Sequence, residues 1–278
     1  MMKHNIQKAA VIGYPISHSL SPVIHSHWIK QYGLNASYEA IAVKPEELEG
    51  FIRSLPKNGF VGVNITLPYK EAVSRLLNEK DAVADRVGAV NTVVAQEGGL
   101  KGYNTDVYGF MENIRSAIPQ DTGRKALILG AGGAARAVCA GLGEAGYSIL
   151  LVNRTREKAE ILVSQMQGTA IKVIDWAAVA KHLPTISLLV NTTSLGMKGQ
   201  ERLEIALDTL PPSALVTDIV YNPLETELLH QAQLRGNPAI DGLGMLLYQA
   251  QQAFYLWFGV LPDVNGELRQ LVLRHRQV

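Results

Sequence analysis

A glycine-rich turn near the middle of the chain has the spacing of a nucleotide-phosphate site. Residues 130–135 read GAGGAA and fit the pattern G-x-G-x-x-A, between an apolar stretch at 126–130 and a helical pattern. In this pattern the first glycine permits a tight turn, the second lets the backbone approach a pyrophosphate, and the helix N-terminus attracts the phosphates. The turn therefore predicts a dinucleotide-binding unit, with an unliganded glycine-rich turn as the alternative.

The residues after the next predicted strand indicate which dinucleotide binds. A site that prefers NAD has a carboxylate about 20 residues beyond the glycines. Here the strand at 148–152 is followed by Asn153, Arg154 and Thr155, and then by Lys158. A guanidinium, a hydroxyl and a second cation suit the 2′-phosphate of NADP, because planar multidentate donors match phosphate oxygens. We therefore predict NADP rather than NAD; the alternative is that Arg154 is a solvated surface residue.

Alternating strand and helix patterns surround these residues and predict an α/β fold. In the first part of the chain we expect strands at 9–13, 37–43 and 60–65, helices from Ser21, at 45–54 and at 68–77, a hairpin within 88–105 and a helix at 106–117. In the second part we expect strands at 126–130, 148–152, 170–174, 186–191, 214–219 and 238–240, helices after residue 130 and at 156–167 and 224–235, then a long apolar helix within 241–260 and an amphipathic helix at 265–275.

Length and composition fit two soluble domains. The chain has 278 residues, of which 47% are hydrophobic and 18% charged, with a formal net charge of +1. The absence of a basic tract argues against nucleic acid as a partner. No apolar run reaches the ~20 residues of a membrane span, and the N-terminus lacks the long apolar region of a signal peptide, so we expect a cytoplasmic protein. His18, His25 and His27 have no convincing further ligand nearby, so we expect no metal.

Six motifs in sequence order resemble those of shikimate dehydrogenases over nearly the whole chain. They are PISHSLSP at 15–22, NITLPYK at 64–70, GAVNT at 88–92, GYNTD at 102–106, the loop at 130 with NRT at 153–155, and DGLGM at 241–245. The resemblance implies a substrate-binding domain made of residues 1–106 plus 242–278 and a Rossmann-like NADP-binding domain of residues 107–241, with the active site in the cleft between them. It also implies the NADP-dependent, reversible reduction of 3-dehydroshikimate to shikimate, in the biosynthesis of aromatic amino acids.

The same resemblance implies a role for particular residues. Ser17 and Ser19 would bind the substrate carboxylate, Asn64, Thr66, Asn91 and Gln249 the ring hydroxyls, Tyr221 would lie near the substrate, and Lys70 and Asp106 would be the catalytic pair. The cofactor-binding residues would be Gly130, Ala131, Gly132, Gly133, Ala134, Asn153, Arg154, Thr155, Lys158, Thr192, Ile219, Gly242 and Met245. The partner would be a small molecule, and the protein a monomer or a homodimer.

The chemistry of the residues agrees with these implied roles. A polyhydroxylated acid is recognised by many neutral donors and acceptors rather than by an apolar pocket. Lys70 falls in the first turn of its predicted helix, where a cation opposes the helix dipole, so the position favours function over folding. A lysine can donate or accept the hydroxyl proton, and an aspartate such as Asp106 can orient it and tune its proton affinity. The cofactor accepts the hydride, so the reaction needs no metal.

Less specific interpretations stay open at these positions. Lys70 could be a solvated helix lysine, Asp106, Ser17 and Ser19 could simply cap helices, and Asn64 and Asn91 could be turn residues. At the level of function, the nearest alternative is a quinate/shikimate dehydrogenase with broader use of substrate or cofactor. A non-catalytic sensor of shikimate and nucleotide is a second alternative, and a lysine-using dehydrogenase that acts on a folate is a third.

Overall fold

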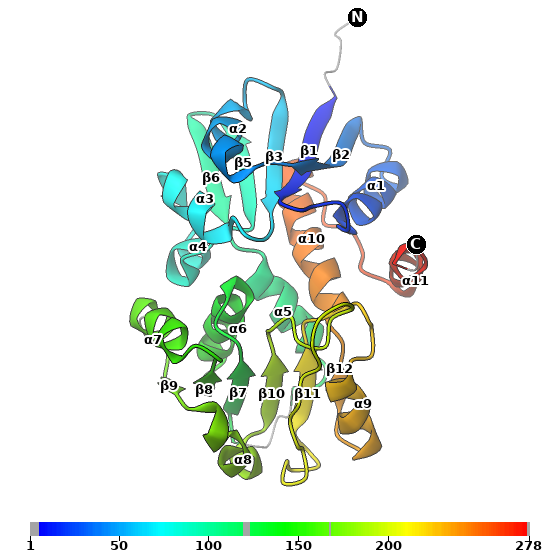
Figure 1. Ribbon diagram of the computed structural model, residues 1–278. Coiled ribbons are helices and arrows are strands. Elements are labelled where there is room, and N and C mark those ends of the chain that lie inside the picture. The colour runs from blue at the N-terminus through cyan, green and yellow to red at the C-terminus, as the bar shows by residue number, and fades with distance from the viewer. Residues whose placement is uncertain (1–5, 119–122, 167, 277–278) are drawn as a thin grey trace, which may run out of the picture. The chain divides into compact units, whose positions relative to one another are not determined.

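The computed structural model describes residues 6–118, 123–166 and 168–276, and the chain divides into two compact units (Figure 1). Unit 1 comprises residues 1–105 and 247–278, and unit 2 comprises residues 106–246. Each unit contains a six-stranded sheet. The predicted α/β class is confirmed. Within the described residues, no helix is long and apolar enough to cross a membrane.

The sheet of unit 1 is mixed, because parallel strands are continued by an antiparallel hairpin. Its strand order is β2-β1-β3-β5-β6-β4. The pairs β1·β2 and β1·β3 are parallel, β5 is antiparallel to both β3 and β6, and β4 is parallel to β6. The predicted strands and the glycine-turned hairpin are confirmed. The strands are β1 (Gln7–Gly13), β2 (Ala36–Ala42), β3 (Phe60–Ile65), β4 (Glu79–Lys80), β5 (Thr92–Gln96) and β6 (Gly99–Tyr103).

The helices of unit 1 differ from the predicted ones in two places. The predicted helix at 45–54 begins with a 3₁₀ turn, Pro45–Glu47, whose Glu47 carboxylate accepts the Lys44 N–H at 3.1 Å. The predicted helix at 68–77 begins only at Lys70, so that Lys70 is its first residue. The short helix α4 was not predicted; its six residues are too few for a clear periodic pattern. The helices are α1 (Ser21–Gln31), α2 (Leu48–Ser54), α3 (Lys70–Leu76) and α4 (Ala82–Val87).

The C-terminal segment completes unit 1, although it is far away in sequence. It contains α10 (Leu243–Phe258) and α11 (Gly266–His275), of which the part from Leu247 onward belongs to this unit. The indole N–H of Trp257 donates to the Val93 carbonyl at 3.0 Å. A Cβ on Gly62 would meet the Trp257 Nε1 at 2.2 Å, so only glycine lets this ring lie against β3. The fold thereby couples the last helices to the first strands.

Unit 2 has the doubly wound, all-parallel sheet that the glycine-rich turn predicted. Its order is β12-β11-β10-β7-β8-β9, so the winding direction reverses between β7 and β10. Ligands of such sheets bind at the carboxyl ends of the strands beside that reversal. The strands are β7 (Lys125–Leu129), β8 (Ser148–Val152), β9 (Ile171–Val173), β10 (Leu188–Asn191), β11 (Leu215–Asp218) and β12 (Ala239–Ile240).

The helices of unit 2 follow the predicted alternation, with shorter ends, except that the four-residue helix α8 was not predicted. They are α5 (Asp106–Ile114), α6 (Gly133–Glu144), α7 (Arg156–Gln165), α8 (Val179–His182) and α9 (Glu227–Leu234). The predicted helix at 224–235 starts three residues late, because the Thr226 side chain accepts the Leu229 N–H and fixes the N-cap. The predicted end of the helix at residue 167 lies outside the described residues.

Candidate active site

The glycine-rich turn of unit 2 has the conformation that phosphate binding requires. Gly130 follows β7 with φ +106°, a region that side chains rarely adopt, and a Cβ there would meet the Thr192 Oγ1 at 2.8 Å. Gly132 is the N-cap of α6, and a Cβ built on it would meet no atom within 4 Å. The space beside Gly132 and the N-terminus of α6 are therefore open to an anionic group. This cradle fits the pyrophosphate of a dinucleotide.

The tip of β8 carries cations that are not neutralised by neighbours. Arg154 and Lys158 are exposed, and within the described residues neither side chain contacts a carboxylate. Arg156, in contrast, donates to Glu160 at 2.8 Å and to Asp175 at 2.6 Å. The Asn153 side chain donates to the Thr155 carbonyl at 2.8 Å and so fixes the turn. Two cations without a described carboxylate partner at this position fit the negatively charged 2′-phosphate of NADP better than the neutral 2′-hydroxyl of NAD.

The remaining residues implied for the cofactor lie on the neighbouring strand ends. The Thr192 hydroxyl donates to the Leu129 carbonyl at 2.7 Å and so ties the end of β10 to the end of β7. A Cβ on Gly242 would meet the Ile219 carbonyl oxygen at 2.2 Å, so only glycine permits this approach. Met245 is buried in the first turn of α10. The structure therefore brings Thr192, Ile219 and Gly242 to the same edge of the sheet as the glycine-rich turn.

A buried carboxylate that was not singled out from the sequence stabilises this edge. Asp218, the last residue of β11, accepts hydrogen bonds from Asn191 Nδ2 at 3.0 Å, from the Val220 N–H at 2.9 Å and from the Thr226 hydroxyl at 2.8 Å. Burial raises the pKa of Asp218 to about 6, although the three donors oppose the shift. One carboxylate thus joins the ends of β10 and β11 to the N-cap of α9. Its position at the end of a buried, apolar strand was the only signal in the sequence.

Unit 1 places the implied carboxylate-binding serines and the lysine near its own strand ends. Ser17 is exposed in the loop after β1, and the Ser19 Oγ accepts the Ser21 N–H at 3.3 Å, so Ser19 takes part in helix capping. Thr66 follows β3 directly; its N–H donates to the Ile12 carbonyl at 3.0 Å, and its carbonyl accepts from Tyr69 at 3.0 Å. These bonds hold the turn that leads into α3, of which Lys70 is the first residue.

All three implied substrate-binding amides lie in unit 1 and are buried. The Asn64 side chain is 5% exposed, that of Asn91 2% and that of Gln249 9%. The Asn91 Nδ2 lies 3.5 Å from the Gln249 Oε1, so that the C-terminal helix α10 meets the end of the hairpin. Asn91 Oδ1 also accepts the Thr105 N–H at 2.7 Å. The sheet edge of unit 1 is therefore rich in oriented amides and hydroxyls rather than apolar groups.

Asp106 and Tyr221 belong to unit 2. Asp106 is the buried first residue of α5. Tyr221 is half-buried in the loop after β11, and burial raises the pKa of its hydroxyl. Lys70 belongs to unit 1. The pairing of Lys70 with Asp106 stays a prediction.

His25 lies in an aromatic cluster of unit 1 rather than in a metal site. Its ring stacks on Tyr38 with centroids 4.1 Å apart, and Trp28, Phe254 and Trp257 surround it. Burial lowers the pKa of His25 to about 3, which the adjacent Asn64 side chain offsets only in part. Across residues 6–118, 123–166 and 168–276, no three His, Cys, Asp or Glu side chains are grouped so as to hold a metal.

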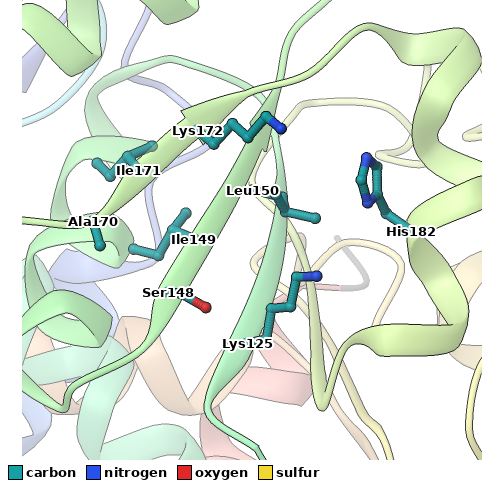
Figure 2. Close-up of a pocket in the computed structure, with 8 residues that line it drawn as sticks. All are labelled: Lys125, Ser148, Ile149, Leu150, Ala170, Ile171, Lys172 and His182. Atoms are coloured by element: carbon teal, nitrogen blue, oxygen red, sulfur yellow. The ribbon is translucent and has the colours of Figure 1, made fainter.

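A separate hollow in unit 2 lies away from the candidate cofactor edge. It has a volume of about 410 Å³, and its lining includes Lys125, Ser148 and Lys172, which lie at or near the amino ends of β7, β8 and β9 (Figure 2). The Lys125 ammonium donates to the Thr185 hydroxyl at 2.9 Å. Burial, assisted by Lys125 and other neighbouring lysines, lowers the pKa of His182 on the same hollow. Because the strands run parallel, this hollow and the glycine-rich turn are at opposite ends of the sheet.

The fold and these strand ends define a two-unit α/β protein with a dinucleotide-binding sheet. Sequence profiles of known families match three segments of the chain. They are the shikimate dehydrogenase substrate binding domain at residues 11–93, shikimate / quinate 5-dehydrogenase at 112–220 and the shikimate 5′-dehydrogenase C-terminal domain at 242–266.

Full-length relatives agree with these profiles. The chain is 51% identical, over 98% of its length and all of the relative, to a protein of Paramagnetospirillum magneticum named shikimate dehydrogenase (NADP(+)). A crystal structure of shikimate 5-dehydrogenase from Thermus thermophilus in complex with NADP(H) and shikimate superimposes with a TM-score of 0.86 at 37% identity, covering 97% of this chain and 99% of that one. Quinate dehydrogenase from Corynebacterium glutamicum in complex with NAD has a TM-score of 0.88 at 30% identity, with coverages of 97% and 99%. The chain belongs to the shikimate dehydrogenase family.

Proposed function

We propose that this protein is an NADP-dependent shikimate dehydrogenase (EC 1.1.1.25) that reversibly reduces 3-dehydroshikimate to shikimate, in the biosynthesis of aromatic amino acids. The observation that carries the proposal is the chemistry of the strand ends of unit 1, where buried amides and hydroxyls accompany a lysine at the start of α3. Such a polar set suits a polyhydroxylated acid and not an aromatic or aliphatic substrate. The relative named shikimate dehydrogenase (NADP(+)), at 51% identity, supports the same substrate and cofactor.

The proposed roles of the residues divide between the two units. The proposed substrate-binding domain, residues 1–106 with 242–278, is unit 1 extended by Asp106 and residues 242–246 of unit 2, and the proposed NADP-binding domain is residues 107–241. Ser17 and Ser19 bind the substrate carboxylate; Asn64, Thr66, Asn91 and Gln249 bind the ring hydroxyls, and Tyr221 assists. The cofactor-binding set is Gly130, Ala131, Gly132, Gly133, Ala134, Asn153, Arg154, Thr155, Lys158, Thr192, Ile219, Gly242 and Met245.

In this proposal the catalytic residues transfer a proton to or from the substrate oxygen. Bound NADPH supplies the hydride, and NADP accepts it in the reverse direction. The Lys70 ammonium donates a proton to the substrate oxygen during reduction, and its neutral amine accepts the hydroxyl proton during oxidation. In its charged form Lys70 also stabilises negative charge on that oxygen. Asp106 is the second catalytic residue and orients the Lys70 side chain toward the substrate oxygen.

Preference for NADP in this proposal comes from Arg154 and Lys158, which find no carboxylate partner within the described part of the chain. Broader use of quinate or NAD is the second candidate, because a quinate dehydrogenase in complex with NAD shares the fold. The lack of a carboxylate at the tip of β8 favours the first candidate. We further propose that the protein works in the cytoplasm as a monomer or a homodimer.

Initial rates, followed by the absorbance of the reduced nicotinamide, test the proposal. Shikimate and quinate are each paired with NADP and with NAD. We expect rapid reduction of the cofactor only when shikimate is paired with NADP. Comparable rates with quinate or NAD would move the protein to the broader-specificity class, and no reduction by folded protein in any pairing would contradict the proposed activity.

A further inference from the structure

A continuous buried chain of hydrogen bonds runs behind the amides of unit 1. The Tyr38 hydroxyl donates to Asn64 Oδ1 at 2.7 Å. Asn64 Nδ2 donates to the Thr92 Oγ1 at 3.1 Å and to the Asn91 carbonyl at 3.3 Å. The Thr92 hydroxyl lies 3.2 Å from Asn91 Oδ1 and donates to it. The four side chains come from β2, β3 and the start of β5, and all are buried.

Elementary hydrogen-bond chemistry fixes the direction of the bonds from Tyr38 through Asn64 to Thr92. The Asn91 backbone carbonyl can only accept, so the Asn64 amide must present its Nδ2 there and its Oδ1 to Tyr38. Tyr38 must therefore donate. Because the Thr92 Oγ1 accepts from Asn64, its single proton is available for Asn91 Oδ1, at 3.2 Å, or for the Thr105 Oγ1, at 3.3 Å. Asn91 Oδ1 also accepts the Thr105 backbone N–H at 2.7 Å, which excludes the flipped amide.

Two consequences follow for the amides that the proposed function assigns to the substrate. Both N–H groups of Asn64 are used within the chain and one oxygen lone pair accepts from Tyr38, so the amide can offer a ligand only an acceptor. The Asn91 oxygen accepts at least two protons, and its Nδ2 group donates to the Thr105 hydroxyl at 2.9 Å and lies 3.5 Å from the Gln249 Oε1. Hydrogen bonds within unit 1 therefore set the orientation of both amides.

We propose that Tyr38 and Thr92 are positioning residues that fix the amides of Asn64 and Asn91 for substrate recognition. Both residues are buried, Tyr38 at 7% and Thr92 at 0% exposed, and each hydrogen-bonds to one or both of the amides. The Tyr38 ring is itself held by the stacked His25, at 4.1 Å between centroids and 12° between planes. This inference rests on the proposed function, because it takes Asn64 and Asn91 to contact shikimate.

Tyr38→Phe keeps the stacked ring and removes only the first donor of the chain, while Thr92→Val removes the link between the two amides. We expect each variant to raise the KM for shikimate about tenfold, the size of one lost hydrogen bond, and to leave the KM for NADP unchanged. Thr92→Ser restores the hydroxyl and is expected to restore the KM. Ile52→Val, a substitution in the core of the same unit, is the control for a simple loss of stability, with the melting temperature of every variant recorded.

A double-mutant cycle separates positioning from direct contact. If Tyr38 acts through Asn64, adding Tyr38→Phe to Asn64→Ala changes the KM for shikimate no further. Additive effects, or an unchanged KM in Tyr38→Phe and Thr92→Val, would overturn the inference. Should Tyr38→Phe fail to fold, the comparison of Thr92→Val with Thr92→Ser decides alone. A wild-type protein without activity on shikimate would instead contradict the proposed function itself.

Discussion

Lys70 is the residue whose removal should affect the reaction most directly. It is the first residue of α3, where its charge opposes the helix dipole and adds nothing to helix stability. We expect Lys70→Ala to lower kcat by at least about 100-fold, the usual contribution of a proton-transferring group, with a much smaller rise in the KM for shikimate. Steady-state kinetics with NADP and shikimate measures both constants. An unchanged kcat would remove Lys70 from catalysis.

Arg154 should govern the choice of cofactor. Its guanidinium is exposed, and no described carboxylate pairs with it. Arg154→Ala should weaken NADP binding about 10- to 100-fold, the effect of one or two charge-assisted hydrogen bonds, and leave NAD nearly untouched. Arg156→Ala is the matched control, because Arg156 is already paired with Glu160 and Asp175. Equal losses for NADP and NAD in Arg154→Ala would mean that Arg154 supports the fold instead.

Residues that belong to a short local motif could be recognised from the sequence. Residues whose hydrogen-bond partners are distant in the sequence could not. The turn at 130–135 and the cations after β8 form short local patterns. Tyr38 and Asn64 are 26 residues apart, and Asn191 and Asp218 are 27 apart. Their pairing depends on which strands are neighbours and in what register. Asp218 and Tyr38 therefore gave no sign of their hydrogen bonds in the sequence.

At the scale of elements, the turn between β7 and α6 offers a contrast between two glycines. Gly132 has φ −92°, and a Cβ there meets nothing within 4 Å, so Gly132→Ala should fold normally. Any loss of NADP affinity then reports that the ligand occupies this space. Gly130 has φ +106° and would press a Cβ against Thr192, so Gly130→Ala should lower stability by more than 1 kcal/mol, roughly the strain of that conformation.

Thermal unfolding and NADP titration of the two glycine variants provide the measurements. Gly132→Ala should retain the melting temperature and lose affinity; Gly130→Ala should lose both. Retained NADP affinity in a stable Gly132→Ala protein would show that no pyrophosphate lies beside this residue.

Long elements were easier to predict than short ones. The parallel strands of unit 2 appear as apolar runs because helices cover both faces of such a sheet. The β5–β6 hairpin was predicted from its Gly98-Gly99 turn, in which both glycines have positive φ. In contrast, β4 has two residues and α4 has six, too short for a period to emerge. The start of α3 was misplaced by two residues, because Pro68 precedes the helix rather than opening it.

At the scale of the whole molecule, two buried titratable groups should shape the dependence of stability on pH. The pKa of Asp218 is raised by burial from 3.8 to about 6. The unfolded chain therefore ionises this carboxyl first, and stability falls by about 3 kcal/mol as the pH rises from about 4 to about 6. The Asp218→Asn variant should not show this loss of stability with rising pH. Urea denaturation from pH 4 to pH 7 measures the free energy of unfolding of the wild type and of the variant. If the difference between these two free energies does not change with pH, the prediction is refuted.

His25 should make the stability of the protein fall as the pH is lowered, which is the opposite of the effect of Asp218. Burial lowers its pKa from 6.5 to about 3, so the unfolded chain takes up the proton first as the pH falls. The contribution of neutral His25 to stability is therefore complete above about pH 6.5 and is lost progressively toward pH 3. His25→Phe should shift acid unfolding, followed by tryptophan fluorescence, to lower pH. His27→Gln, on the same helix but only half-buried, is the control; an equal shift in both variants would contradict a specific role of His25.

The hydrogen bond between Trp257 and Val93, and Gly62, which makes room for the indole ring, have a consequence for how the chain folds during its synthesis. A ribosome releases residues 6–105 first, yet their sheet lacks the helix that lies against β3 and β5 until Trp257 has been translated. Residues 106–246 are contiguous and are all translated before that point. All of unit 2 is therefore translated before the last helix contact of unit 1 can form.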